Sequence, residues 1–586
     1  MRTVSKTWHL LPHDRDAIEQ LSKSLKLSPL IAQLLLNRGI HESERITRFL
    51  TVPFKGLLPP QMLPGVPEAA ERLYTAIRQG QRICVYGDYD VDGLTGTALL
   101  WQALRLLGAT VDYYVPHRLD EGYGLNTDAL YRIANQGTSV VVTVDCGITS
   151  TAEAEAAKRL GLELIVTDHH EIKDRLPEAA VLVHPRLPGG SYPFGDLSGS
   201  GVAFKLAWAL CQCGSGTEKV TPEFREFLLD SVALAALGMV ADWVPLHDEN
   251  RIIVKHGLAR LRQTPSPGLQ ALLAGSPLGG KTAITSSDIS FAIAPRLNAA
   301  GRLGCARLVV ELLTTTSSTR AHELTRFLEG QNSDRQKIEH KTLTQAQEMV
   351  ALLDLDCTPA LVLARPDWHP GVIGIVAGRL VEIYARPVLM IALREEPAVG
   401  QGSGRSVPGF LLHKALGACG EFLISHGGHA AAAGFKIQRE QVDTFRQQFC
   451  SFAADHFPQG PAAPRLIIDA EVSLSMLTPG LIETLAHLEP YGAGNPRPRF
   501  LAGPVQVLGK PRRVGKGERH LQFRVQQQGT QIPAIGFGLA DRAEEIMSSR
   551  GQCFLVFTPN FNEWQGRRTI QLEVTDFQPG TQAKLA

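Results

Sequence analysis

An alternation of short apolar runs and amphipathic segments over residues 82–185 constrains the fold of this chain more than any other feature. The runs RICVYG (82–87), SVVVTVD (139–145) and LELIVTD (162–168) can be buried on both faces, and segments with helical periodicity separate them. Strands of this kind, alternating with helices, form parallel sheets that helices cover on both sides, with right-handed crossovers. We therefore predict an α/β domain built on a parallel sheet.

The remaining chain changes character several times. Apolar residues recur at helical spacing over 318–353, and Pro359 prevents that helix from continuing. A smaller α/β pattern follows, then the linker-like QGPAAP (459–464), then short alternating strands with Gly turns. We predict an α/β multidomain protein with these parts: an N-terminal helical segment (1–55), a first α/β domain (56–317), a long connecting helix (318–355), a smaller α/β domain (356–458) and a C-terminal β-barrel (465–580).

Composition limits the kinds of partner and the compartment. With 59 Lys+Arg and 58 Asp+Glu in 586 residues, any nucleic-acid surface must be local. The nine cysteines are scattered, which argues against a disulfide framework and favours a reducing cytoplasm. The N-terminus has no secretory h-region. The apolar run Ser231–Ala241 is shorter than the ~18–20 residues that span a bilayer, so we expect a buried helix and no membrane.

Acidic and histidine residues follow three of the predicted strands. Ligands of open α/β sheets bind at the carboxyl ends of the strands, so these side chains should converge. Asp242, which ends the buried run, is a fourth candidate, because a buried carboxylate is costly unless paired or coordinated. Together they would suit Mn²⁺ or Mg²⁺. The candidate residues are Asp88, Asp90, Asp92, Asp145, Asp168, His169, His170 and Asp242.

Two other interpretations compete with a metal site. Any single Asp could be a turn residue or a helix cap, and that explanation is strongest for Asp168. GSPLGGKT (275–282) fits the Walker A pattern, but a helix-like segment precedes it where a strand is required. We expect a surface loop there and keep nucleoside triphosphate hydrolysis as a minor alternative.

These motifs, taken in order, resemble the DHH phosphoesterase family, named for the triplet at 168–170. GGHAAAAG (427–434) resembles the motif of the associated DHHA1 domain. With PRLNAAGRL (295–303), GSGRS (402–406) and a C-terminal β-domain, the order is similar to RecJ-like, single-strand-specific DNA exonucleases of that family. The resemblance covers roughly residues 55–580 and implies a DHH catalytic domain, a DHHA1 domain and an OB-fold-like barrel.

The resemblance also implies roles for the acidic residues. Asp90 and Asp145, with Asp88 beside them, would hold one divalent cation, Mn²⁺ or Mg²⁺. A second would be held by Asp92, Asp145, His169 and Asp242, so that Asp145 bridges both, and His170 would contact the scissile phosphate. Smaller DHH relatives carry a His where this chain has Tyr86, which leaves Asp88 as a substitute in the first ligand set. Two metals ~3.5–4 Å apart can activate water for in-line displacement at phosphorus.

Substrate-binding residues are expected in the second lobe and around the cleft. Guanidinium groups and Gly-rich loops suit phosphate, and in RecJ-like proteins these motifs hold the 5′ end of the strand. Alone, His429 would more often be a satisfied core histidine. The candidates are Arg118, Arg296, Arg302, Ser403, Arg405 and His429.

The C-terminal domain carries a local basic run between Arg497 and Arg519, with Phe500, His520 and Phe523 interleaved or adjacent. An OB-like barrel binds single strands by stacking and backbone charge, although a solvated hairpin loop fits the same run. The candidate DNA contacts here are Arg512, Arg513 and Lys516.

The sequence thus favours a metal-dependent 5′-to-3′ exonuclease on single-stranded DNA, acting in DNA recombination and repair. The alternatives are a DHH phosphoesterase acting on short oligonucleotides or cyclic dinucleotides, and a DNA-binding scaffold without activity. The family makes a helicase and a single-strand-binding protein plausible partners, and we expect a monomer.

Overall fold

The computed structural model describes residues 6–118, 120–173, 175–396, 398–457, 463–548, 550–564 and 567–585. The chain divides into two compact units. The first unit comprises residues 57–244 and 253–463, and the second comprises residues 5–56, 245–252 and 464–586. The N-terminal helices therefore belong with the C-terminal barrel, although sequence analysis treated them as a separate segment.

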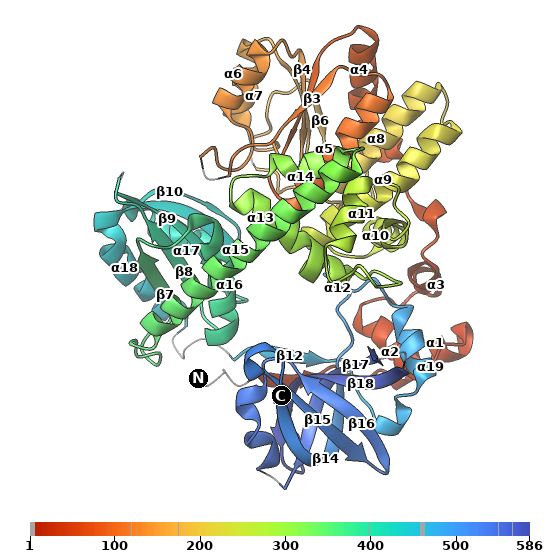
Figure 1. Ribbon diagram of the computed structural model, residues 1–586, viewed down its shortest axis with the longest axis vertical. Coiled ribbons are helices and arrows are strands. Elements are labelled where there is room, and N and C mark those ends of the chain that lie inside the picture. Colours follow the sequence, from red (N-terminus) through yellow and green to blue (C-terminus); the bar gives the residue numbers. More distant parts are fainter. Residues whose placement is uncertain are drawn as a thin grey trace. The chain divides into compact units, whose positions relative to one another are not determined.

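The first unit opens with the predicted parallel sheet, in the order β3-β2-β4-β5-β6 (Figure 1). All neighbouring strands run parallel, which confirms the predicted fold class. The strands are β2 (Ile83–Gly87), β3 (Val111–Tyr114), β4 (Val140–Val144), β5 (Glu163–Thr167) and β6 (Val181–Val183). The helices that connect or precede them are α4 (Val66–Arg78), α5 (Val91–Leu106), α6 (Thr127–Asn135) and α7 (Thr151–Arg159).

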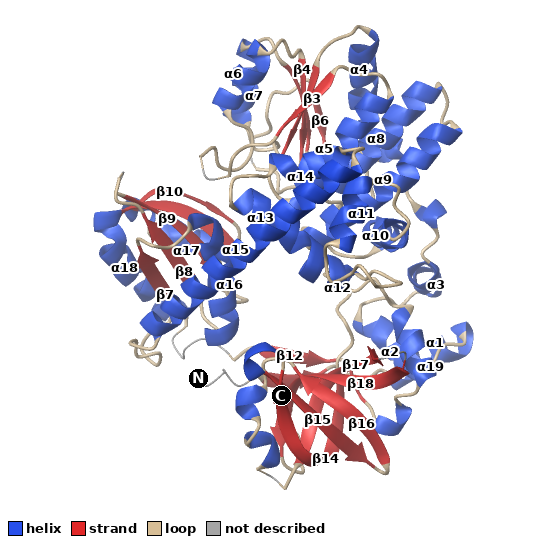
Figure 2. Cartoon of the chain, viewed as in Figure 1, coloured by secondary structure: helices blue, strands red, loops and turns tan. Residues whose placement is uncertain are grey.

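Helices follow the sheet in sequence, as the colours of Figure 1 show, and Figure 2 draws these helices in blue. The apolar run at 231–241 lies in α9 (Pro222–Ala241) and is buried along almost its whole length. No helix in the described part of the chain is long and apolar enough to cross a membrane. The other helices here are α8 (Gly199–Ser215), α10 (Asp248–Leu261), α11 (Pro267–Ala274), α12 (Ser286–Asp288), a π-helix (Ile289–Ile293), α13 (Ala294–Arg302) and α14 (Arg307–Thr314).

The Walker-like segment 275–282 lies between α11 and the three-residue α12. Its Lys281 donates from Nζ to Oδ1 of Asp288 at 2.6 Å. A phosphate-binding loop needs a strand before it and a helix after it. The structure therefore gives no support to nucleoside triphosphate hydrolysis at this segment.

A long helix, α15 (Ser318–Val350), leads to the second lobe of the first unit (Figure 1). That lobe is built on a mixed sheet in the order β10-β11-β9-β8-β7. Its strands are β7 (Leu361–Arg365), β8 (Val388–Leu393), β9 (Val399–Arg405), β10 (Leu423–Gly428) and β11 (Ala432–Gln438). Its helices are α16 (Pro370–Tyr384), α17 (Leu412–Ala418) and α18 (Val442–His456).

The second unit is a closed β-barrel with helices packed against it. The barrel closes because β14 pairs with both β15 and β17, while β18 pairs with β16 and β17. The sheet of the barrel contains β13 (Ala470–Glu471), β14 (Phe500–Val514), β15 (His520–Gln527), β16 (Thr530–Gly536), β17 (Gln552–Trp564) and β18 (Arg567–Pro579). A further strand of this unit, β12 (Arg465–Ile468), belongs to a separate two-stranded sheet. The other elements are β1 (Thr7–Leu10), α1 (Arg15–Leu25), α2 (Pro29–Asn37), α3 (Ser43–Thr51) and α19 (Pro479–Ala486).

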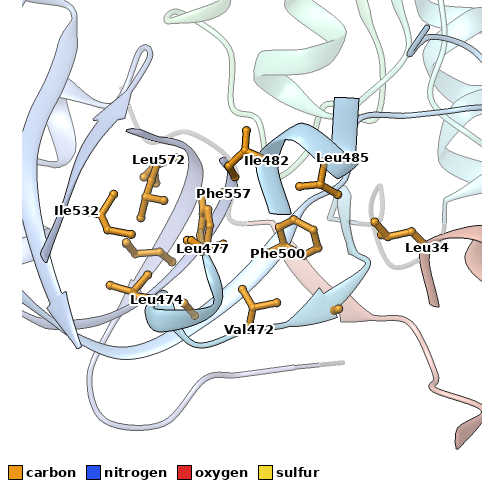
Figure 3. Close-up of a cluster of buried hydrophobic side chains, with 14 of the residues drawn as sticks. Leu34, Val472, Leu474, Leu477, Ile482, Leu485, Phe500, Ile532, Phe557 and Leu572 are labelled. Atoms are coloured by element: carbon orange, nitrogen blue, oxygen red, sulfur yellow. The ribbon is translucent and has the colours of Figure 1, made fainter. Parts of the chain in front are cut away.

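A single hydrophobic cluster joins the barrel to the N-terminal helices. Leu34 of α2, Leu485 of α19 and Phe500 of β14 are all buried in it (Figure 3). In addition, β1 pairs in parallel with β12, and Trp8 donates from Nε1 to Asp576 at 2.8 Å. The burial of these apolar side chains and the β1–β12 pairing tie β1, α1, α2 and α3 to the C-terminal domain.

Candidate metal and substrate site

The predicted acidic residues meet at the carboxyl ends of the parallel strands in the first unit. Asp88 directly follows β2, and Asp145 directly follows β4. Asp90 is the N-cap of α5, and its side chain accepts from the backbone of Asp92 and Gly93. Asp242 is the C-cap of α9. Residues that are more than 150 positions apart in the sequence are thereby brought to one edge of the sheet.

Three overlapping groups of side chains could each hold a metal ion. Within each group, the ligand-type atoms lie within 4.8 Å of one another. Asp145 belongs to two of these groups, as the predicted bridging role requires. The groups are Asp88–Asp90–Asp145, Asp92–His169–Asp242 and Asp145–His169–His170. We call the residues of these groups the acidic cluster.

His169 lies among several carboxylates of the acidic cluster. Its Nε2 is 3.1 Å from Oδ1 of Asp145, 3.6 Å from Oδ2 of Asp242 and 3.9 Å from Oδ2 of Asp92. Burial, followed by the positive charge of His170, lowers the pKa of His169 to about 4. Its ring is therefore neutral at physiological pH, which is the form that binds metals.

The carboxylates destabilise one another unless a cation is bound. Burial raises the pKa of Asp145 well above its usual value, and the charges of Asp92 and Asp90 raise it further. Burial and then Asp92 raise the pKa of Asp242 to about 9. Among the described residues, Oδ1 of Asp88 and Oδ1 of Asp145 are buried without a hydrogen-bond partner. Hard oxygen ligands with neutral imidazole fit divalent Mn²⁺ or Mg²⁺.

Tyr86 stands where smaller relatives have a histidine, and in this structure its side chain makes a buried structural hydrogen bond. It is fully buried in β2, and its hydroxyl donates to the backbone oxygen of Gly124 at 3.0 Å. Asp88 instead completes the first group with Asp90 and Asp145, as the sequence interpretation expected.

Asp168 does not belong to the acidic cluster but lies behind it. Its carboxylate accepts from the backbone nitrogens of Ile148, His169 and His170, and Nδ1 of His170 lies 2.8 Å from its Oδ1. Burial opposes ionisation, but these hydrogen bonds prevail and lower the pKa of Asp168 to about 2. Burial also opposes the protonation of His170, but Asp168 outweighs it and raises the pKa of His170 to about 9. Asp168 therefore orients a protonated His170.

The N-terminus of α8 supports Asp92, and sequence analysis missed it. The hydroxyl of Ser198 donates to Oδ1 of Asp92 at 2.9 Å, and the backbone nitrogens of Gly199 and Ser200 donate to the same carboxylate. A Cβ at Gly199 would lie 2.5 Å from the side chain of Asp145, so only glycine fits there. The signal was visible as a Ser N-cap with nearby glycines in DLSGSG (196–201).

Tyr123 is a second residue that sequence analysis missed. Its hydroxyl donates to the backbone oxygen of Asp145 at 3.3 Å and lies 3.1 Å from Nδ1 of His170. Half of its surface is exposed. Tyr123 lies in the loop between β3 and α6, so the hydrophobic periodicity that identified the strands and helices did not single it out.

Three of the predicted substrate residues gather near the acidic cluster. Burial, and then the like charges of Arg118, Arg335 and Arg405, lower the pKa of Arg302 to about 9. Arg118 also lowers the pKa of Arg405, after burial. The acidic cluster is close by, because the Arg118 guanidinium lies 4.9 Å from the centre of the ring of Tyr89, which stands between Asp88 and Asp90 in the chain. We call Arg118, Arg302 and Arg405 the arginine trio. Such a concentration of half-buried positive charge suits a phosphate group.

The second lobe presents its predicted residues from a sheet rather than from the expected Gly-rich loops. Ser403 and Arg405 lie in β9, and Nη1 of Arg405 donates to the Ser403 hydroxyl at 3.4 Å. His429 lies in the turn between β10 and β11, with Nδ1 3.3 Å from the Glu171 carboxylate. His429 is exposed, so it is not a core histidine. The glycines allow the strands to pack closely: a Cβ at Gly402 would overlap the ring of Phe435.

Arg296 is engaged by neighbouring groups of the protein. Its Nε donates to Glu329 at 2.5 Å and its Nη1 to the backbone oxygen of Ala292 at 2.5 Å. This ion pair joins α13 to α15. The substrate contact at Arg296 stays a prediction.

In the second unit, the basic run lies at the end of β14 and in the loop after it. Arg512, Arg513 and Lys516 are exposed there, and we call them the basic segment. Phe500 and Phe523, which stand near the basic residues in the sequence, are buried in the barrel and do not join them at the surface. In each case the side chain points into the barrel, as the alternation of a strand requires.

Comparisons with known proteins match each part of the chain. Residues 82–236 match the family described as "DHH family, N-terminal domain", residues 358–455 match "DHHA1 domain", and residues 468–576 match "RecJ OB domain". The single-stranded-DNA-specific exonuclease RecJ of Bacillus subtilis is 38% identical over 571 residues, which are 97% of this chain and 70% of that protein.

Solved structures agree with the sequence comparison. The crystal structure of Thermus thermophilus RecJ in complex with Mn²⁺ has a TM-score of 0.82 at 32% identity and covers 98% of this chain and 80% of that chain. The structure of the same protein in complex with Mg²⁺ has a TM-score of 0.76 at 31% identity, covering 98% of this chain and 79% of that chain. The acidic cluster, the order of the domains and these similarities lead to one conclusion: the chain belongs to the RecJ family of DHH exonucleases.

Proposed function

We propose that this chain is a metal-dependent exonuclease that hydrolyses the phosphodiester bonds of single-stranded DNA from the 5′ end towards the 3′ end. The observation that carries the proposal is the position of Arg118 and Arg302 beside the loop of the acidic cluster. The Arg118 guanidinium lies 4.9 Å from the centre of the Tyr89 ring, and a Cβ at Gly301, next to Arg302, would lie 2.5 Å from the backbone oxygen of Tyr89. A site that binds metals next to a site that binds a terminal phosphate cleaves near a chain end.

The acidic cluster has ligands for two divalent cations, Mn²⁺ or Mg²⁺. Asp88, Asp90 and Asp145 would hold one, and Asp92, Asp145, His169 and Asp242 the other. Bound there, the cations would supply Lewis-acid activation of water and of the scissile phosphate.

The protein's own groups do the remaining work. Asp168 keeps His170 protonated, so that its ring can donate to a phosphate oxygen. The arginine trio would bind the 5′-terminal phosphate, with the Ser403 hydroxyl beside Arg405. His429, which lies near Glu171, would contact the strand from the second lobe. The basic segment would bind the strand backbone at the barrel.

The biological setting is part of the same proposal. We propose a cytoplasmic monomer that acts in DNA recombination and repair, with a helicase and a single-strand-binding protein as partners. The exposed basic segment on an OB domain supports DNA as the partner, because a mononucleotide substrate needs no such surface.

The test is digestion of end-labelled single-stranded and duplex DNA with Mn²⁺, Mg²⁺ or chelator. We expect rapid release of mononucleotides from 5′-phosphorylated single strands, slower release from 5′-hydroxyl strands, and no release with chelator. Degradation from the 3′ end would overturn the polarity. Activity confined to dinucleotides or short oligonucleotides would instead support the alternative of a small-substrate phosphoesterase.

A further inference from the structure

Four arginines line one cavity of the second unit. The cavity has a volume of about 190 Å³, and every residue that lines it belongs to that unit. Arg38 directly follows α2, Arg45 and Arg48 lie in α3, and Arg251 lies in the first turn of α10. We call this cavity the arginine pocket. It contains no residue of the acidic cluster or of the arginine trio.

Arg251 brings a buried positive charge to the arginine pocket. It is 2% exposed, and its guanidinium lies 3.7 Å from the centre of the Phe49 ring. Among the described residues, its hydrogen bonds all go to backbone carbonyl oxygens, including those of Phe49 and Glu489 at 2.9 Å. Burial is the main reason that the pKa of Arg251 falls to about 9. A cation buried without a carboxylate partner is stabilised by an anion beside it.

Arg38 is a second buried cation of the arginine pocket. Its side chain is 3% exposed, and its Nη1 lies 3.6 Å from Oδ1 of Asp469. Its Nε donates to Oδ1 of Asn495 and its Nη2 to the backbone oxygen of Pro496, both at 2.6 Å. These bonds fix the guanidinium, as the carbonyl oxygens fix that of Arg251. The charge of the arginine pocket is therefore preorganised.

Arg45 and Arg48 differ from the buried pair because their side chains are exposed. They are three residues apart on α3, so both lie on the same face of that helix. The structure gives neither side chain a hydrogen bond or an ion pair to a described residue. Their guanidinium donors are thus available to a ligand, whereas most donors of Arg38 and Arg251 are already used.

The acidic residues near the arginine pocket balance only part of this charge. Of the described residues that line it, Asp248 is the one acid, and its Oδ2 lies 3.5 Å from Nδ1 of His247. Asp469, which pairs with Arg38, does not line the pocket. Four guanidiniums therefore face two carboxylates, which leaves an excess of two positive charges. A phosphate monoester carries about −1.5 to −2 charges near pH 7 and matches that excess.

The size and the walls of the arginine pocket restrict the ligand further. Its volume of about 190 Å³ is below the ~300–1,000 Å³ of pockets that enclose drug-sized molecules. Apolar side chains, among them Ile40, Val52 and Ile252, form part of the wall. A phosphate group fits such a space, and the forked donors of arginine suit its oxygens.

We propose that the arginine pocket binds a small phosphate anion, either inorganic phosphate or the terminal phosphate of a mononucleotide. A phosphate within a strand is a diester with one negative charge and a chain on both sides, so it fits the charge and the cavity less well. The inference goes beyond the proposed function, because it holds whether or not the acidic cluster hydrolyses DNA.

The experiment measures phosphate binding by calorimetry in the full-length protein with chelator present. The ligands are inorganic phosphate, thymidine 5′-monophosphate and thymidine. All variants carry Arg118→Gln and Arg405→Gln, which weaken the arginine trio as a competing phosphate site. On that background, Arg45→Gln with Arg48→Gln is compared with the matched control Arg15→Gln with Arg524→Gln. The control also removes two exposed arginines of the second unit, and neither lines the arginine pocket. Thermal unfolding shows that each variant is folded.

We expect the background protein to bind inorganic phosphate and thymidine 5′-monophosphate but not thymidine. Arg45→Gln with Arg48→Gln should weaken phosphate binding about tenfold or more, and the control should change nothing. Tighter binding of the monophosphate would identify a nucleotide as the ligand, and equal affinities would identify inorganic phosphate. The proposal fails if the background protein binds no phosphate, if the Arg45 and Arg48 changes leave the affinity unaltered, or if thymidine binds as well as its monophosphate. It also fails if these changes weaken only oligothymidine binding, because the ligand is then the strand.

A second measurement uses the wild-type protein and no substitution. Phenylglyoxal modifies accessible guanidiniums, and mass spectrometry of peptides locates each modified arginine. Inorganic phosphate should slow the modification of Arg45 and Arg48 severalfold and leave Arg15 and Arg524 unchanged. Equal protection of all four arginines, or protection of none, would contradict a specific site.

Discussion

The acidic cluster of the first unit and the basic segment of the second differ in how their charged side chains are held: the first are buried and fixed, and the second are exposed. Asp88, Asp92 and Asp145 are at most 2% exposed, and backbone groups, glycines and neighbouring helices fix their positions. Arg512, Arg513 and Lys516 are exposed in one short stretch of chain. In the buried cluster each residue depends on all the others, whereas the exposed residues act nearly independently through a screened field.

The difference implies that hydrolysis and DNA binding respond differently to single substitutions in this protein. A buried array of like charges is stable only when complete and loaded with metal, so one substitution should abolish its function. An exposed surface should lose affinity in small steps. The predictions that follow test this contrast, from the largest expected effect to the smallest.

Asp145→Ala should have the largest effect. Asp145 belongs to two of the three groups, so its loss removes a ligand from both proposed metal positions. We expect activity to fall by about a thousandfold or more, because several kcal/mol of charge stabilisation are lost. The measurement is single-turnover digestion together with metal binding by calorimetry, with the fold checked by circular dichroism. Normal turnover by a folded variant would refute the two-metal proposal.

Asp168→Asn should reduce activity by roughly ten- to a hundredfold, as expected for a residue that orients another. Without the carboxylate, the pKa of His170 should fall from about 9 towards its ordinary value, and protonated His170 should be lost at lower pH. The rate at high pH should therefore suffer more than the rate at low pH. A uniform loss at every pH would show that Asp168 only supports the fold.

Metal affinity should depend on pH in a definite direction. Because burial and mutual repulsion raise the pKa values of Asp88, Asp145 and Asp242, the metal-free site holds protons that a metal must displace. Raised carboxyl pKa values also mean that the metal-free fold loses stability as pH rises through them, up to about 9 for Asp242.

We therefore expect apparent Mn²⁺ affinity to increase about tenfold per pH unit between pH 6 and 8 for each proton released. The unfolding temperature gained by adding Mn²⁺ should increase over the same range. Isothermal titration in buffers of different ionisation enthalpy counts the protons. An affinity independent of pH would mean that the carboxyls are already ionised without metal.

Neutralising the basic segment should have the smallest effect. The triple variant Arg512→Gln, Arg513→Gln and Lys516→Gln removes three exposed charges. The slope of log affinity against log salt should decrease by about two, since each charge contributes about 0.7 on single strands. The turnover rate at saturating DNA should not change. An unchanged slope would identify the segment as a solvated loop, and a lost turnover would remove the contrast between the two regions.

Much of the fold followed from local patterns. Apolar runs such as 139–145 predicted β4, and the helical spacing that ends before Pro359 predicted α15. The acidic residues of the site were also visible, because they follow a strand directly, lie at the start of the helix after it, or end a buried helix. Ser198 and Tyr123 were missed because their roles depend on contacts with residues distant in the sequence.

By itself, the sequence determined which residues carry the chemistry, because the carboxylates, imidazoles and guanidiniums stand together in short motifs such as GDYDVDG, TDHH and GSGRS. Only the tertiary structure decided how they are used. It paired Arg296 with Glu329, set the Asp168 carboxylate against His170, buried Phe523 and exposed Phe537. The physical reason is that burial, charge and hydrogen bonding at a residue depend on which distant segments pack against it, and a linear pattern does not contain that information.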